Sequence, residues 1–155
     1  MYVEHISLAT SGISQSVDTL RHSFDAAYRS RFGHSRGRGL YTEDDWRRIS
    51  SCYELLRGTG GSFLDVGVGP GALLNLLTLD PSISMACGID IRRYTKLVEV
   101  SGTLDIRIMS VDNMSFSDKE FDTVVCMEVL EHISLPQFLK ALTELRRVAK
   151  YRLFM

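Results

Sequence analysis

The sequence has few cysteines, no excess of one charge and no long apolar run. Its three cysteines, Cys52, Cys87 and Cys126, are odd in number and far apart, which excludes a disulfide framework and the ligand spacing of a zinc site. With 18 basic and 19 acidic residues, the composition excludes a generally basic nucleic-acid coat. No apolar run approaches the ~20 residues of a membrane helix, and the first residues show no signal-peptide pattern. We therefore expect a soluble, cytoplasmic protein with reduced, mostly buried thiols.

The rest of the composition is that of an ordinary globular domain. Hydrophobic residues make up 45% and charged residues 24% of the 155 positions. A chain of this length buries roughly 70% of its unfolded surface, so it can form a core without a metal ion or disulfides. We expect an N-terminal helical extension over residues 1–60 and a second unit over residues 61–155.

The first 60 residues predict two helices on either side of an arginine-rich segment. Apolar residues at spacings of three and four indicate a helix over residues 14–28. Thr42 with Asp45 has the pattern of a capping box and starts a second helix, which ends at Gly58. Between the helices, residues 28–39 contain four arginines, three glycines and no acidic residue, which predicts a mobile loop.

From Ser62 onward, short apolar runs alternate with helical patterns. We expect strands over residues 63–66, 85–89, 106–109, 123–127 and 151–155. Helices are expected over residues 71–79, 93–101 and 134–150, the last of them starting with a capping box of Ser134 and Gln137. This alternation implies right-handed crossovers and a parallel sheet covered by helices on both faces. The sequence therefore predicts an α/β, Rossmann-like fold.

Three alternate glycines follow the first predicted strand, at Gly67, Gly69 and Gly71. They allow a tight turn and close approach of a ligand to bare backbone. The spacing fits the dinucleotide fingerprint, with Asp90 near the distance expected of a ribose-binding acid. Asp65, however, would bring a carboxylate toward the pyrophosphate of a dinucleotide, whereas an ammonium or sulfonium group would be attracted to it. We therefore favour S-adenosylmethionine over a nicotinamide dinucleotide.

Four motifs in order resemble those of the class I S-adenosylmethionine-dependent methyltransferases, in particular the small-molecule branch that includes quinone-biosynthesis enzymes. Residues 65–71 are similar to the first motif, and residues 88–90 to the second, whose acid binds both ribose hydroxyls. Residues 110–116 resemble the third, whose acid accepts from the adenine amino group, and residues 121–133 resemble the fourth strand and the loop after it. The resemblance implies S-adenosylmethionine as the cofactor, bound by Asp65, Gly67, Gly69, Gly71, Asp90, Ile91, Asp112, Asn113 and Met127.

The loop after the fourth predicted strand contains Glu128, Glu131 and His132, near the expected sulfonium end of the cofactor. These residues have three interpretations: loop and cap residues only, a base (His132 or Glu128) that accepts a proton from the methyl acceptor, or a divalent-metal site. The metal interpretation rests on a likeness to the motif of small-RNA terminal 2′-O-methyltransferases, which requires a further histidine, and none follows His132. We therefore expect no metal, and His132 and Glu128 are the candidate catalytic residues.

The resemblance implies a methyltransferase that acts on an unidentified small-molecule acceptor. The alternatives are a non-catalytic binding module or truncated fragment and, less favoured, an RNA 2′-O-methyltransferase or an NAD-dependent oxidoreductase. The family's sheet usually has seven strands, so we expect a C-terminally short sheet whose exposed last strand could join a second copy of the chain. We expect no membrane partner and disfavour, without excluding, a nucleic-acid partner. Residues 28–39 are either a linker or part of a lid that attracts an anionic acceptor.

Overall fold

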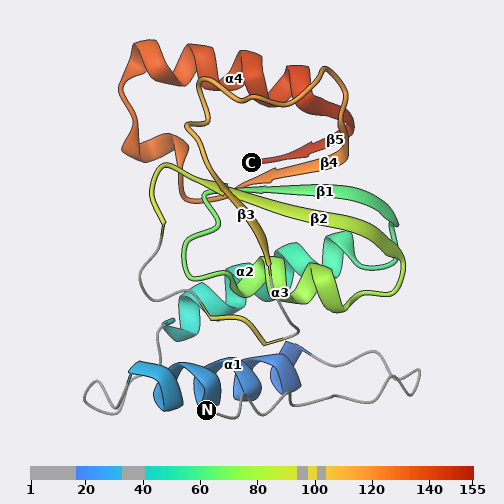
Figure 1. Cartoon of the computed structure of the whole chain (residues 1–155), viewed down its shortest axis with the longest axis vertical. Helices are drawn as coiled ribbons and strands as arrows, with labels where there is room; N and C mark the ends of the chain where they lie inside the picture. Colours follow the sequence, from blue (N-terminus) through green and yellow to red (C-terminus); the bar gives the residue numbers. More distant parts are fainter. Residues whose placement is uncertain (1–16, 33–40, 94–97, 101–103) are drawn as a thin grey trace.

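The structure is a computed structural model that describes residues 17–32, 41–93, 98–100 and 104–155 (Figure 1). Its helices and strands are, in chain order, α1 (Val17–Phe32), α2 (Glu43–Leu56), β1 (Gly61–Val66), α3 (Ala72–Leu79), β2 (Ile83–Asp90), β3 (Asp105–Ile108), β4 (Phe121–Cys126), the 3-10 turn η1 (Leu130–His132), α4 (Leu135–Val148) and β5 (Ala149–Phe154). The described elements confirm the predicted α/β class.

The five strands form one sheet in the order β3-β2-β1-β4-β5, and every neighbouring pair is parallel. The central strand β1 pairs with β2 on one side and with β4 on the other, so that Val66 lies in register with Ile89 and Cys126. The strand order changes direction between β1 and β4. In open parallel sheets, ligands bind beyond the carboxyl ends of the strands at such a switch point.

Helices cover both faces of this sheet, as the strand–helix alternation predicts (Figure 1). Helix α4 lies against β4 and β5 on one face, and α3 lies against β1 and β2 on the other. Helix α2 lies beside α3, and α1 lies beyond them (Figure 1). The three helices share an apolar cluster, which includes Leu20, Phe24, Trp46, Leu56 and Leu77. The N-terminal helices are therefore joined to the sheet domain through a common core.

Both predicted capping boxes are present. Asp45 N–H donates to Thr42 Oγ1 at 3.2 Å, and Thr42 N–H donates to Asp45 Oδ2 at 2.7 Å, which starts α2. Ser134 and Gln137 form the same reciprocal pair at the start of α4. These side chains use backbone groups that a helix end leaves unpaired, so the local sequence alone defines both starting points.

The structure corrects the sequence-based prediction for the arginine-rich segment. Helix α1 continues through Phe32, so residues 28–32 are helical and not part of a mobile loop; residues 33–39 lie outside the described residues. Tyr28 extends the buried face of the helix, and Arg29 and Arg31 lie in its last turn, where cations interact favourably with the helix dipole. The extra turn thus has a local electrostatic cause and a packing cause.

Other predicted bounds need adjustment as well, since β1, β2, β4 and β5 each begin two residues before the predicted start. Of the helix expected over residues 93–101, the described residues Arg93 and 98–100 are not helical, and the rest lies outside the described residues. Val98 and Val100 instead donate backbone hydrogen bonds to Pro70 O and Asn75 Oδ1, which ties this stretch to α3. Strand β5 begins at Ala149, two residues before the predicted start, directly after α4. No described helix is long and apolar enough to cross a membrane.

Candidate functional site

A cavity of about 250 Å³ opens at the carboxyl ends of β1 and β4, at the switch point of the sheet. It brings together five residues that the sequence singles out: Asp65, Gly67, Gly69, Met127 and Glu128. Three positions of α2 form the opposite wall, with the preceding Tyr41 beside them. The cavity is therefore built jointly by the sheet domain and the N-terminal extension.

The glycine loop between β1 and α3 needs glycine for its backbone angles. Gly67, Gly69 and Gly71 have φ values of 81°, 50° and 95°, which side-chain-bearing residues rarely adopt. A Cβ atom on Gly67 would lie 2.1 Å from Val129 Cγ2, whereas one on Gly69 would meet no atom closer than Gly67 O at 3.8 Å. The loop thus packs tightly at Gly67 and has room for a Cβ atom at Gly69.

Asp65 is the most buried acid of the cavity, with 5% of its surface exposed on the inner part of β1. Burial, and then the negative charge of Asp90, raises the pKa of Asp65 to about 7. No hydrogen bond from the described residues offsets this burial. A carboxylate in this position, facing a cavity, is suited to pair with a cation.

Asp90 stands at the end of β2 and holds the glycine loop. Gly69 N–H donates to Asp90 Oδ2 at 3.1 Å, and Arg92 N–H donates to Asp90 Oδ1 at 3.4 Å. Each carboxylate oxygen can accept a second hydrogen bond, which a ligand could donate. Ile91 follows with 70% of its side chain exposed, at the same edge of the sheet. Neither residue lines the cavity, so this part of the predicted site lies outside it.

Asp112 and Asn113 lie in the loop that follows β3. Ser110 Oγ donates to Asp112 Oδ1, and Asn113 N–H donates to Ser110 O at 3.1 Å, which closes a tight turn. Asp112 is half-buried and Asn113 is exposed. The two residues follow a strand adjacent to β2, so the structure places the three predicted acids at the carboxyl ends of three neighbouring strands.

The two candidate bases occupy different surroundings. Glu128 lines the cavity, has a positive φ of 56°, and forms an ion pair in which its Oε1 lies 3.4 Å from Arg48 Nε. A non-glycine residue in this conformation indicates local strain, which often accompanies functional sites. His132 lies in η1 with 73% of its side chain exposed and does not line the cavity. The geometry therefore brings Glu128, rather than His132, next to Asp65 and the glycine loop.

Sequence reasoning missed the contribution of α2 to the cavity. The sequence pattern assigns Asp45 to the helix cap and Ile49 to the apolar face of the helix and gives Arg48 no role, yet all three line the cavity. Arg48 also pairs with Asp45, its Nη2 lying 2.5 Å from Asp45 Oδ1. No local pattern marks these residues, because their place depends on how α2 packs over the glycine loop.

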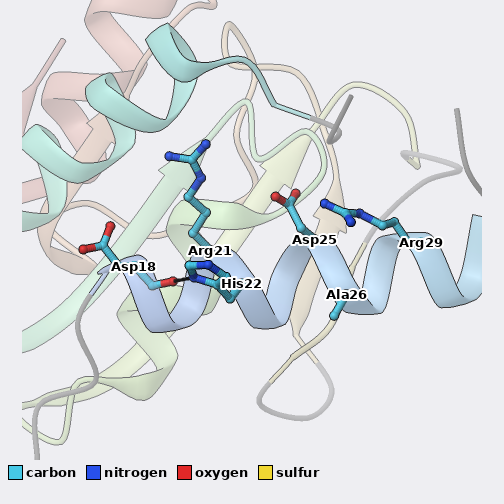
Figure 2. A pocket seen from close by; sticks show the side chains of 6 residues that line it. All are labelled: Asp18, Arg21, His22, Asp25, Ala26 and Arg29. Carbon is cyan, nitrogen blue, oxygen red and sulfur yellow. Dashed lines mark hydrogen bonds between the residues drawn. The ribbon is translucent and has the colours of Figure 1, made fainter. Parts of the chain in front are cut away.

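A second hollow, of about 690 Å³, is unrelated to the strand ends. All of its described lining residues lie along α1, including Arg21, His22, Asp25 and Arg29 (Figure 2). His22 Nδ1 lies 2.7 Å from Asp18 O, a contact within the same helix. This hollow contains none of the residues that the motifs single out.

Neither a nucleophilic thiol nor a metal cluster is found in the described part of the chain. The three cysteines are buried, and burial raises the pKa of Cys52 to about 11 and those of Cys87 and Cys126 to about 12, so the unreactive thiol form dominates. No three His, Cys, Asp or Glu side chains among the described residues are grouped to hold a metal ion.

Fold and cavity together define a Rossmann-like α/β domain with a ligand site at the carboxyl edge of its sheet. Residues 64–152 match the family described as methyltransferase domain, and the chain belongs to that family. This assignment confirms the resemblance carried by the four motifs. The matched range begins within β1, ends within β5 and includes all of the predicted site residues.

The chain is also similar to proteins from archaea. An uncharacterized protein of Methanocaldococcus jannaschii is 36% identical over 87 residues, which are 56% of this chain and 35% of that protein. A SAM-dependent methyltransferase from Archaeoglobus fulgidus superposes with a TM-score of 0.57 at 23% identity, covering 68% of this chain and 47% of that one. A Methanococcus maripaludis protein superposes with a TM-score of 0.54 at 17% identity, covering 87% of this chain and 59% of that one. The chain therefore spans 35% of the curated relative and about half of these two structures, which share its fold.

Proposed function

We propose that this protein is an S-adenosylmethionine-dependent methyltransferase that acts on a small-molecule acceptor. The observation that carries the proposal is the buried carboxyl group of Asp65, which faces the cavity beside a loop of positive-φ glycines. S-adenosylmethionine has an ammonium and a sulfonium group and no phosphate, so its charges suit this carboxylate. The pyrophosphate of a nicotinamide dinucleotide would be repelled at the same place.

The residues fit this cofactor along the whole carboxyl edge. Asp65 would pair with the ammonium group, and the bare backbone at Gly67 and Gly69 would lie against the methionine portion, with Gly71 closing the turn. Asp90 would accept from the ribose hydroxyls, and Ile91, Asp112 and Asn113 would contact the adenine. The cavity of about 250 Å³ is smaller than typical small-molecule sites of about 300–1,000 Å³. It therefore suits the methionine portion, with the nucleoside over the open strand ends.

The cofactor would supply an activated methyl group, so the chain needs no nucleophile of its own. Its residues would align the acceptor and exclude water from the site, with Met127, Leu73 and Ile49 as apolar walls. Glu128 would accept the acceptor's proton, because it lines the cavity and its Arg48 partner orients the carboxylate. His132 is the second candidate base, and it would have to move toward the cavity to act.

Calorimetry with S-adenosylmethionine and with NAD tests the proposal. We expect binding of S-adenosylmethionine alone, and Asp90→Ala should weaken it by about 1.5–3 kcal/mol, the scale of lost hydrogen bonds to a charged group. Asp105→Ala is the matched control. Asp105 lies at the amino end of the neighbouring strand β3, whereas Asp90 is in register with Ile108 at the carboxyl end of β3. Preferential binding of NAD would contradict the proposal.

Transfer of a labelled methyl group to the small-molecule fraction of a cell extract tests the activity itself. We expect label to appear there with the wild-type chain and to fall at least about tenfold with Glu128→Gln, since general bases contribute roughly 10²–10⁴-fold. Cofactor binding without any transfer would instead identify a non-catalytic binding module.

A further inference from the structure

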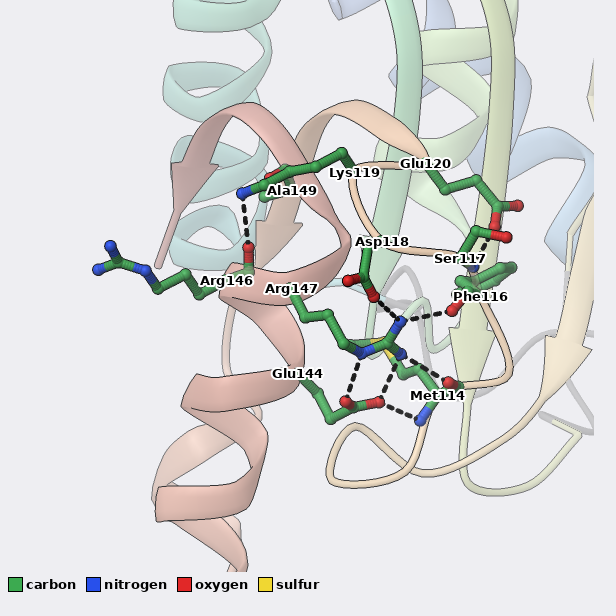
Figure 3. Close-up of polar contacts among 10 residues, drawn as sticks. All are labelled: Met114, Phe116, Ser117, Asp118, Lys119, Glu120, Glu144, Arg146, Arg147 and Ala149. Carbon is green, nitrogen blue, oxygen red and sulfur yellow. Dashed lines mark hydrogen bonds and ion pairs between the residues drawn. The ribbon is translucent and has the colours of Figure 1, made fainter.

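A cluster of polar contacts joins the end of α4 to the loop between β3 and β4 (Figure 3). At its centre, Arg147 Nε and Nη2 donate to Glu144 Oε1 and Oε2 at 2.7 and 2.8 Å, a two-point pair within one turn of α4. Arg147 Nη1 also donates to Phe116 O at 2.6 Å and to Asp118 Oδ1 at 3.0 Å. The Arg147 side chain thus contacts Glu144 within its own helix and two separate points of the loop.

The pair holds both backbone groups of Met114. Met114 N–H donates to Glu144 Oε2 at 2.7 Å, and Met114 O accepts from Arg147 Nη2 at 2.8 Å. Glu144 and Arg147 are mostly shielded from solvent, with 18% and 27% of their side chains exposed. Hydrogen bonds to charged groups in such surroundings are stronger and more directional than neutral ones. Both the N–H and the C=O group of Met114, which directly follows Asn113, are therefore held by α4.

Buried and exposed side chains alternate along this loop. Val111, Met114 and Phe116 are buried in the core beneath α4, whereas Asp112 is half-buried and Asn113 is exposed between them. The two outward residues make their described hydrogen bonds only with Ser110, inside the same turn. Their position on the sheet edge is consequently set by the anchors on either side, namely Val111 before them and Met114 after them.

We propose that Glu144 and Arg147 are positioning residues for adenine recognition: they hold Met114 and thereby place Asp112 and Asn113 against the adenine ring. The inference rests on the proposed function, which assigns this loop to the adenine half of S-adenosylmethionine. It adds two residues of α4, separated from Asp112 by 32 and 35 positions in the sequence, that would contact neither cofactor nor acceptor. They would act on the selectivity for the base rather than on the methyl transfer.

The loop has a second, apolar anchor that makes the test practicable. The Phe116 ring packs edge-on against Phe121 with centroids 4.8 Å apart, and Arg107 lies over the Phe116 ring at 5.3 Å. These contacts do not involve Glu144 or Arg147. We therefore expect Arg147→Lys and Glu144→Gln to keep the fold and to loosen only the segment next to Asn113.

The test compares two ligands that differ at the base. S-adenosylhomocysteine carries the 6-amino group that Asp112 would accept from, and S-inosylhomocysteine carries a carbonyl oxygen there. Dissociation constants for both are measured by calorimetry on the full chain, for the wild type, Arg147→Lys, Glu144→Gln and the control Asp118→Asn. Asp118 belongs to the same cluster but has 77% of its side chain exposed, so its loss should change neither constant.

We expect the wild type to prefer the adenine ligand by about tenfold or more, the scale of one hydrogen bond to a charged acceptor. In Arg147→Lys and in Glu144→Gln this ratio should fall at least about fivefold, while S-inosylhomocysteine binds within about threefold of the wild type. Equal weakening of both ligands, or an unchanged ratio in variants that remain folded, would overturn the inference. Failure of the wild type to bind either ligand would instead overturn the proposed function.

Discussion

Under the proposed function, Asp65 selects the charge that the cavity accepts. Its carboxyl group is buried, its pKa is raised to about 7, and the described residues provide no hydrogen bond to its charged form. A bound ammonium group would favour the ionised form and lower this pKa toward the ordinary value of about 3.9. Binding of such a ligand is therefore coupled to release of a proton near neutral pH.

This coupling predicts the pH dependence of cofactor affinity. Below pH 7 the free protein must lose a proton to bind, so affinity should fall by up to about tenfold for each pH unit below that value. Calorimetry with S-adenosylhomocysteine between pH 5.5 and 8.5 measures this acidic limb of the pH dependence. Asp65→Asn should bind more weakly and lose the acidic limb; an acidic limb that persists in this variant would assign the titration to another group.

At the scale of one element, we expect two glycines of the loop between β1 and α3 to serve different purposes: Gly67 for folding and Gly69 for ligand binding. Gly67 combines a φ of 81° with a Cβ position only 2.1 Å from Val129 Cγ2, whereas Gly69 has a φ of 50° and a Cβ position whose nearest neighbour, Gly67 O, is at an ordinary contact distance of 3.8 Å. Gly69 N–H is in addition tied to Asp90. The two glycines are two positions apart, and yet the structure gives them different constraints.

Alanine at each position tests this separation. Gly67→Ala should lower the free energy of unfolding by about 1–3 kcal/mol, because strain and a side-chain clash add. Gly69→Ala should cost about 1 kcal/mol from backbone strain alone and weaken cofactor binding more strongly than Gly67→Ala does, because its methyl group enters the ligand space. Urea denaturation and calorimetry on both variants provide the comparison. Equal unfolding costs would contradict the contact geometry at Val129.

At the scale of the whole molecule, the N-terminal helices and the sheet domain share one core. Trp46 of α2, the chain's only tryptophan, packs edge-on against Phe24 of α1 with ring centroids 5.7 Å apart. Both lie in the apolar cluster that also contains Phe63 of β1 and Leu77 of α3. The division at residue 60, which the sequence predicts, therefore crosses a continuous apolar core.

Unfolding monitored by two signals tests whether these parts act as one unit. Trp46 fluorescence reports on the N-terminal helices, and far-UV circular dichroism reports on the whole chain. We expect coincident urea transitions, and Phe24→Ala should shift both together by about 3–5 kcal/mol, the cost of a large core truncation. A fluorescence transition that precedes the dichroism transition would make residues 1–60 a separate unit.

The sequence by itself determined the fold class, the parallel sheet and the loop at its edge. Strand–helix alternation, two capping boxes and three alternate glycines act over a few residues, and the carboxyl ends of parallel strands must share one edge, so Asp65, Asp90 and Asp112 were expected near one another. The loop predicted from local patterns was wrong at residues 28–32, where the helix dipole and the burial of Tyr28 favour the helix.

Only the tertiary structure decided what surrounds those residues. The packing of α2 over the sheet brought Arg48 to Glu128, 80 positions away in the sequence, and left His132 outside the cavity. The hydrogen bond from Arg147 to Met114 O and the burial of Asp65 likewise depend on which helix covers which part of the sheet. Such contacts follow from the directions in which elements pack, and these directions leave no periodic signature in the sequence.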